Sequence, residues 1–469
     1  MNLPQPSDAS AQFAQVIAQT SYDQLPAAAV EAAKKSILDT LAVMAAACGS
    51  SQALRGAVDL ALEMGGRAEA SVAGTGRKIP ALMAAFVNGA AVHCLDYDDI
   101  EYESVYHPSG AVVPAALALA ERAAPVSGKD FIRAVALGQD LGIRMARAIP
   151  AQRKPPWHRT VVVGTFAAAA AGAATMRLDA PRVVDALGHA LNHAAGSLEL
   201  RWGTGSDIGG MYCGLSAKAG VFSALLAQRG VPGVAQVFDS AAGFFNLYFK
   251  GRCDRAALLD GLGQEFRGAD TALKPWPACA ATNTYVLATL NLMREHDLAA
   301  PDIEHITLLV GDYAAKNCEP LAQRRRPICA ADAKFSLPWT VALAAVHGDL
   351  RMPHFEPAAL TDPAVRAMAD RIGFERAGAF DITYGMPPGA LRLTTRDGRS
   401  FSRREDLPHG HPARPLSWGQ LEAKALECLA LAQPWLAPSA AGELVDLCTS
   451  LEQVPDVSRL AQLLRSPGI

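Results

Sequence analysis

The stretch VVVGTFAAAAAGAATM, residues 161–176, decides the fold class. Its many alanines favour a helix, and its lack of charged side chains indicates a helix that close-packed neighbours bury on all sides. The stretch is shorter than the roughly 20 apolar residues that a membrane-spanning helix needs. A chain built around such a segment is predicted to be mainly α-helical, with a large core.

Signals for further helices lie on both sides of this stretch. Ser127 and Asp179 are each placed to cap the N-terminus of an apolar segment. Ser417 and Gln420 form a capping-box pattern ahead of residues 421–432. Residues 1–265 show no alternation of strands and helices, so a nucleotide-binding sheet is not expected.

The pattern changes after about residue 266. Residues 303–313 are rich in β-branched side chains and predict a strand, and residues 390–406 predict a hairpin with Asp397-Gly398 at its turn. Helices are expected between them, at 337–346 and 362–372. We therefore predict a helical domain formed by residues 1–268 and 409–469, interrupted by a smaller α+β domain at 269–408.

Composition narrows the possible partners and compartments. The chain has 469 residues, half of them hydrophobic, and a net charge of −3, which gives no electrostatic reason to expect nucleic acid or an anionic membrane. Nine cysteines without a CxxC pair argue against a disulfide scaffold and a zinc ribbon. The first residues lack the basic and apolar regions of a secretory signal, so a cytoplasmic protein is expected.

The run HCLDYDDIEYESVYHPSG, residues 93–110, is the most polar part of an otherwise apolar region. Its carboxylates, Asp96 among them, crowd around His107. A carboxylate next to an imidazole can orient the ring and prepare it for acid–base work. A solvated acidic loop would have the same composition, and the residues alone do not separate the two interpretations.

Three other segments carry candidate polar groups. His158 precedes the alanine-rich helix, where it could be catalytic, a cap or a core residue. Lys274, in LKPWPACAATN (residues 273–283), is either a partly desolvated carboxylate ligand or a surface lysine. Arg326 and Lys334 belong to the basic segment 322–339, which could bind an anionic substrate, form a solvated edge or make subunit contacts.

No metal site is predicted from the sequence. His189 and His193 have the i, i+4 spacing of two metal ligands on a helix. They lack the glutamate of an HExxH motif and any obvious third ligand.

Six segments resemble, in order, motifs of the MmgE/PrpD family, which includes 2-methylcitrate dehydratase, cis-aconitate decarboxylase and iminodisuccinate epimerase. The matching segments are LDYDD…HPSG (95–110), H-x5-GT (158–165), CGLSAKAG (213–220), KPWPAC (274–279), RRP…DAKFSLPW (325–339) and RPLS (414–417). Together they span the chain from about residue 20 to 430.

The resemblance implies a helical domain made from both chain ends, a smaller α+β lid, a homodimer, and no metal or organic cofactor. It also implies an active site that the two domains share. Carried over by motif, the catalytic residues are Asp96, His107, His158 and Lys274. The residues expected to bind the substrate are Tyr97, Cys279, Arg326 and Lys334.

The chain also departs from the family pattern. Ile100 stands where members related to cis-aconitate decarboxylase have a threonine, Gly209 where they have a lysine, and Cys279 where a histidine is frequent. Fewer cationic groups remain to hold a tricarboxylate, which favours a smaller or less charged acid.

The predicted reaction is proton abstraction next to a carboxylate, followed by loss of water from a small hydroxy acid. One histidine would remove the proton and the other would protonate the leaving hydroxyl. An epimerase would use the same abstraction and return the proton from the opposite face. The same residues would also be compatible with a decarboxylase, or with a protein that binds a carboxylate without catalysis.

Overall fold

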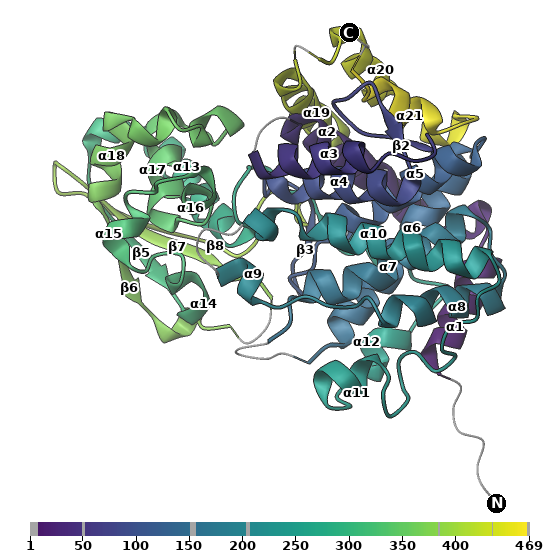
Figure 1. The fold of residues 1–469 in the computed structure, drawn as a ribbon. Coiled ribbons are helices and arrows are strands. Elements are labelled where there is room, and N and C mark those ends of the chain that lie inside the picture. The colour runs from purple at the N-terminus through teal and green to yellow at the C-terminus, as the bar shows by residue number, and fades with distance from the viewer. Residues whose placement is uncertain are drawn as a thin grey trace, which may run out of the picture. The chain divides into compact units, whose positions relative to one another are not determined.

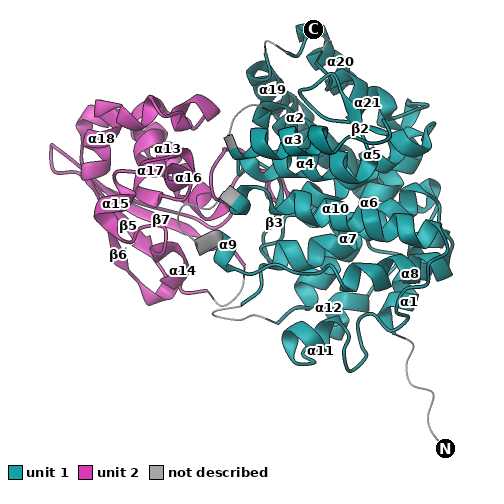
Figure 2. Cartoon of the chain, viewed as in Figure 1, with its two compact units in different colours: residues 1–271, 417–469 teal, residues 272–416 magenta. Residues whose placement is uncertain are grey.

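The computed structural model describes residues 8–48, 52–150, 156–202, 207–382, 385–433 and 435–466. The chain divides into two compact units, coloured separately in Figure 2. Unit 1 consists of Met1–Thr271 and Ser417–Ile469, and unit 2 of Ala272–Leu416. Unit 1 is built mainly from helices and unit 2 combines helices with a sheet (Figure 1), so the predicted mainly α fold with a smaller α+β part is confirmed.

Unit 1 packs its helices around the alanine-rich helix α7 (Arg159–Thr175). Every residue of α7 from Thr160 to Thr175 is buried, because α5, α6, α8 and α10 pack against it. The other helices of the unit are α1 (Ala9–Gln19), α2 (Ala27–Ala47), α3 (Gln52–Met64), α4 (Ala81–Cys94), α5 (Ser109–Ala123), α6 (Gly128–Ala148), α8 (Ala180–Leu191), α9 (Glu199–Trp202), α10 (Tyr212–Gln228), α11 (Phe244–Phe249), α12 (Arg255–Leu259), α19 (Trp418–Leu431), α20 (Pro438–Thr449) and α21 (Ser458–Leu463). The short strands of unit 1 are β1 (Ala70–Ser71), β2 (Lys78–Ile79) and β3 (Ile100–Glu101). A fourth short strand, β4 (Thr271–Ala272), includes the last residue of unit 1 before the chain enters unit 2 and the first residue of unit 2.

The predicted helix caps of unit 1 are confirmed. The Ser127 hydroxyl accepts a hydrogen bond from the backbone of Asp130 at 3.2 Å, at the start of α6. The Asp179 carboxylate caps α8 in the same way, and Ser417 forms a capping box with Gln420 at the start of α19. Each bond satisfies a backbone N–H that the first turn of a helix leaves without a partner.

Unit 2 is organised on a four-stranded sheet of order β6-β5-β7-β8. The strands are β5 (Ile303–Val310), β6 (Ile372–Arg376), β7 (Gly389–Thr395) and β8 (Ser400–Glu405). β7 and β8 form the predicted hairpin, with Gly398 in the turn at a φ of 88°. β5 pairs antiparallel with β7 and parallel with β6, and this parallel pairing was not predicted.

The helices of unit 2 cover this sheet and build a core of their own. They are α13 (Ala280–Glu295), α14 (Asp312–Ala315), α15 (Leu321–Arg324), α16 (Ala330–Lys334), α17 (Leu337–His347) and α18 (Pro363–Asp370). α13 packs on β7 and β8, and α17 packs on α13 and α18. Side chains of β5, β7, α13 and α17 meet in one hydrophobic cluster inside the unit.

Within the described ranges, no helix of either unit has both the length and the apolar character required to cross a membrane.

Candidate active site

Two helices of unit 1 cross closely enough to bring the polar run 93–110 against α10. A Cβ atom on Gly89 of α4 would lie 2.9 Å from the Cα of Gly214 in α10. A Cβ on Gly214 would lie 2.1 Å from the carbonyl oxygen of Phe86. Only glycine therefore fits at positions 89 and 214, where the two helices cross. The crossing places His93, which lies one turn after Gly89, beside Cys213.

Asp98 is the centre of the polar cluster. Its two carboxylate oxygens lie 2.9 and 3.0 Å from His93 Nδ1, and Oδ2 lies 3.1 Å from His107 Nδ1. The two imidazole rings meet edge to face, with centroids 4.8 Å apart. Asp98 is only 1% exposed, so these contacts lie in a region of low dielectric where electrostatic interactions are strong.

These contacts fix the tautomers of both histidines. His107 Nδ1 lies 2.7 Å from the carbonyl oxygen of Asp99, which can only accept, so this nitrogen carries a proton. Burial by itself raises the pKa of Asp98, but the charges of His93 and His107 and their hydrogen bonds bring that pKa well below its ordinary value. Ionised Asp98 can only accept, so His93 Nδ1 donates as well. In both rings Nδ1 is the nitrogen that faces the Asp98 carboxylate.

Ser109, the first residue of α5, holds the Asp99 carboxylate in place. The carboxylate accepts a hydrogen bond from the backbone of Ser109 at 3.2 Å and another from the Ser109 hydroxyl, and Gln139 donates to that hydroxyl at 2.7 Å. Burial raises the pKa of Asp99 to about 7, although the hydrogen bonds from Ser109 oppose the rise. The carbonyl of the same residue anchors His107, so Asp99 positions the ring.

Tyr212 connects this cluster to His158. Its ring centroid lies 4.3 Å from that of His93 and 4.5 Å from that of His158. His158 occupies the N-cap position of α7, but its side chain makes no capping bond. The backbone N–H of His107 donates to Thr160 Oγ1, in the first turn of α7, at 3.4 Å. The two predicted catalytic histidines of unit 1 thus belong to one continuous set of ring contacts.

Asp96 and Tyr97 are buried in the same loop. Asp96 adopts a φ of 51°, a conformation that aspartate tolerates better than most residues, and its backbone N–H donates to the His93 carbonyl at 2.9 Å. Lys424 donates to the Tyr97 carbonyl at 3.0 Å and lies over the Tyr97 ring. The loop is buried at Asp96, Asp98 and Asp99, so the solvated-loop interpretation is wrong.

The remaining candidates belong to unit 2. Lys274 is 1% exposed, so the surface-lysine interpretation is wrong. Cys279 is buried at the N-cap of α13, and its backbone N–H donates to the carbonyl of buried Lys334 at 3.0 Å. Arg326 forms an ion pair with Asp370 at 2.6 Å, which a substrate would have to displace. The convergence of these residues with the histidines of unit 1 stays a prediction.

Sequence reasoning missed four members of the cluster: His93, Asp98, Tyr212 and Cys213. The first two lie inside the polar run and the other two at the start of α10, but nothing in their spacing favours Asp98 over its acidic neighbours. His189 and His193, the two histidines with i, i+4 spacing, each contact other groups of unit 1. His189 Nε2 lies 3.0 Å from the Val231 carbonyl, and His193 packs against Phe222.

Comparisons with known proteins agree along most of the chain. The model of the MmgE/PrpD N-terminal domain matches residues 11–256, and that of the MmgE/PrpD C-terminal domain matches residues 276–449. Cis-aconitate decarboxylase of Mus musculus is 29% identical over 84% of this chain and 80% of its own length. The Homo sapiens protein of the same name is 29% identical over 83% of this chain and 81% of its own length. The cis-aconitate decarboxylase-like protein oryM of Aspergillus oryzae is 25% identical over 97% of both chains.

Proposed function

The chain belongs to the MmgE/PrpD family, and from that premise we propose that it is a lyase that acts on a small carboxylic acid by moving protons at the carbon next to a carboxylate. One observation carries the proposal. The buried Asp98 carboxylate contacts the imidazoles of His93 and His107, and ring contacts through Tyr212 connect this pair to His158. Such an arrangement is suited to general acid–base catalysis.

The proposed chemistry divides two proton transfers between two histidines. One of His107 and His158 removes the proton next to the substrate carboxylate, and the other delivers a proton to the departing group. Asp98 and the Asp99 carbonyl keep the His107 ring oriented throughout. The buried ammonium of Lys274 is proposed to bind the substrate carboxylate and to stabilise the negative charge that develops on the enolate-like intermediate.

Elimination of water from a hydroxy acid is the reaction that we propose. It needs a base for the carbon-bound proton and an acid for the hydroxyl, the two roles that we propose for His107 and His158. Decarboxylation is the second candidate, because the similar proteins from Mus musculus and Homo sapiens carry the name cis-aconitate decarboxylase. Ile100, Gly209 and Cys279, where the chain departs from the family pattern, favour a substrate smaller than a tricarboxylate.

The reaction can be identified with a panel of hydroxy and unsaturated di- and tricarboxylates in deuterated water. NMR of the products and measurement of released CO2 separate the candidates. Elimination gives an alkene without CO2, and decarboxylation gives CO2. Epimerisation puts deuterium into recovered acid without forming an alkene. Ligand-dependent thermal stabilisation without turnover of any acid would contradict the proposed lyase activity.

Substitution of the histidines tests their assignment. His107→Gln and His158→Gln should each lower kcat by ~10²–10⁴, the usual contribution of a positioned acid or base, while circular dichroism shows an unchanged fold. Lys274→Met should raise KM for the carboxylate, and Lys274→Arg should raise it less. The control is His193→Gln, which changes an exposed histidine of the same unit. Wild-type turnover in both His107→Gln and His158→Gln would reject the assignment.

A further inference from the structure

Lys424 is a buried cation that the proposed chemistry does not use. It lies in α19, which returns from unit 2 to pack on α2 (Figure 1), and it is 7% exposed. Its ammonium forms an ion pair with Asp39 of α2 at 2.6 Å. It also donates to the Tyr97 carbonyl at 3.0 Å and lies 3.9 Å from the centre of the Tyr97 ring. We propose that Lys424 is a positioning residue of the active site, which acts by holding the loop that presents Asp98.

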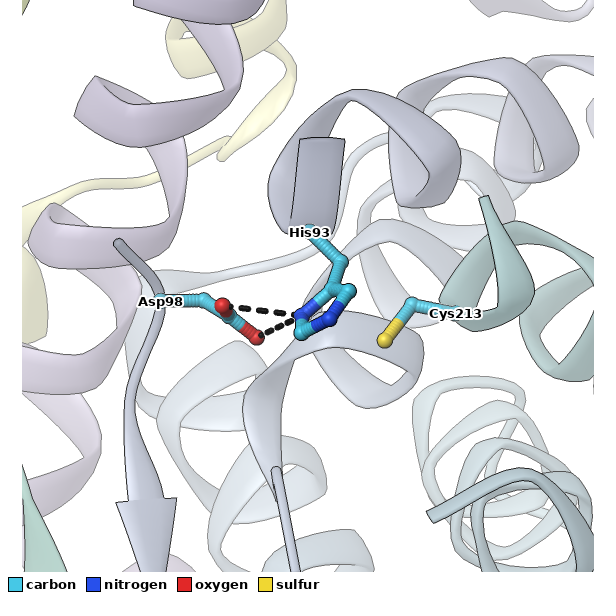
Figure 3. Close-up of side chains that lie close together, drawn as sticks. All are labelled: His93, Asp98 and Cys213. Carbon is cyan, nitrogen blue, oxygen red and sulfur yellow. Dashed lines mark hydrogen bonds and ion pairs between the residues drawn. The ribbon is translucent and has the colours of Figure 1, made fainter. Parts of the chain in front are cut away.

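The contact reaches the central carboxylate through a single peptide group. Tyr97 and Asp98 are consecutive, so the carbonyl that Lys424 holds belongs to the peptide group that continues into Asp98. Because a peptide group is planar, fixing its oxygen also restrains the Cα atom that follows. Figure 3 shows the Asp98 carboxylate against the His93 ring, with hydrogen-bond distances of 2.9 and 3.0 Å to Nδ1. A shift of this peptide would therefore change how Asp98 orients the ring.

Two helices that are distant in the sequence fix the residues on either side of Asp98. Lys424 of α19 holds Tyr97, and Ser109 of α5 holds the Asp99 carboxylate. Asp96 comes just before them with a φ of 51°, a conformation that persists only where the surrounding contacts support it. Restraint from packed helices on both neighbours keeps a side chain within the narrow range of positions that catalysis needs.

The depth of the ion pair supports a role beyond stability. Asp39 and Lys424 are 1% and 7% exposed. Removing two charges from water costs free energy that their attraction often fails to recover, and an apolar pair of similar volume often serves stability as well or better. The hydrogen bond to the Tyr97 carbonyl is a contact that an apolar side chain could not make. Asp39 balances the charge of the donor that makes it.

Paired substitutions separate the hydrogen bond from the ion pair, since removing one charge alone leaves the other buried and uncompensated. Asp39→Asn/Lys424→Met removes both the ion pair and the donor to Tyr97. Asp39→Asn/Lys424→Gln removes the ion pair but keeps an NH2 group that can donate to that carbonyl. The first should lower kcat roughly 10–100-fold with little change in KM, and the second should recover most of that loss. Equal kcat values in the two variants would overturn the proposal. Asp39→Leu/Lys424→Met replaces the first variant if it fails to fold by circular dichroism.

Nitrogen-15 NMR of the imidazoles gives a readout that needs no turnover, which is required because the role of Lys424 rests on the proposed lyase function. Asp39→Asn/Lys424→Met should shift the Nδ1 signals of His93 and His107. The control is Lys34→Met, which removes a lysine that is also 7% exposed and pairs with Glu452 at 2.7 Å, and it should leave these signals and kcat unchanged. Unchanged signals in the double variant would overturn the proposal. Shifted signals in a chain whose wild type turns over no acid would support the positioning role and reject the lyase function alone.

Discussion

At the scale of single residues, the site depends on a carboxylate that two imidazoles share. The carbonyl oxygen of an asparagine at position 98 could accept a hydrogen bond from one imidazole. Its NH2 group would face the Nδ1 proton of the other imidazole, where two donors cannot form a hydrogen bond. Asp98→Asn should therefore lower kcat by ~10² or more with a small change in KM, because it disturbs ring orientation. Nitrogen-15 NMR of the imidazoles should show a changed tautomer. Asp446→Asn, on the exposed face of α20, is the control, and a wild-type kcat with an unchanged imidazole spectrum would contradict this role.

Asp99 gives a prediction about pH and stability. Its pKa of about 7 in the folded chain exceeds the value near 3.9 expected after unfolding. The folded state therefore holds the proton more tightly, and the stability from this group is complete below about pH 4 and is lost as the pH rises through about 7. Between pH 5 and 8 the free energy of unfolding of the wild-type chain should fall by about 2–3 kcal/mol relative to Asp99→Asn. Urea denaturation of both proteins at both pH values measures this difference, and parallel pH profiles would contradict it.

The sequence located the polar run but not its central carboxylate. His107 and His158 were selected through the resemblance to family motifs, because the residues alone left other interpretations of both open. Choosing Asp98 over Asp96 was not possible, because the choice depends on the path of the backbone. Asp96 turns with a φ of 51°, and no pattern of residue types encodes that turn.

At the scale of elements, local signals were reliable and long-range contacts were not. The caps at Ser127, Asp179 and Ser417 and the Asp397-Gly398 turn depend on a few neighbouring residues, and all four were predicted. The parallel pairing of β5 with β6 and the crossing of α4 with α10 join segments far apart in the chain. Neither produces a local pattern, although the crossing is what places Tyr212 and Cys213 beside His93.

The α4–α10 crossing can be tested with one methyl group. Gly214→Ala would place its Cβ 2.1 Å from the Phe86 carbonyl oxygen and 2.7 Å from the Ala90 nitrogen. Both are backbone atoms, so the helices must move apart. The free energy of unfolding should fall by ~1–3 kcal/mol, and activity should fall as well. Gly442→Ala, on α20 where nothing lies within 4 Å, should instead stabilise the chain by about 0.5–1 kcal/mol. Equal effects of the two substitutions in a denaturant titration would contradict the close packing.

At the scale of the whole molecule, the chain forms two units that each bury hydrophobic side chains. Ile306 in β5 and Ile132 in α6 are both fully buried, the first in unit 2 and the second in unit 1. One hydrophobic cluster lies wholly within unit 2 and another wholly within unit 1. Each is therefore expected to open as a separate cooperative region.

Hydrogen exchange followed by mass spectrometry tests this expectation. Ile306→Ala should cost about 2–5 kcal/mol through the cavity it leaves. If unit 2 opens by itself, the loss of amide protection should be confined to residues 272–416. Ile132→Ala removes the same atoms from an equally buried site in unit 1 and should give the reverse pattern. If both variants lost protection uniformly along the chain, the two units would have to unfold as one. The Lys274 segment of unit 2 could then not become mobile while the histidine cluster of unit 1 stays ordered.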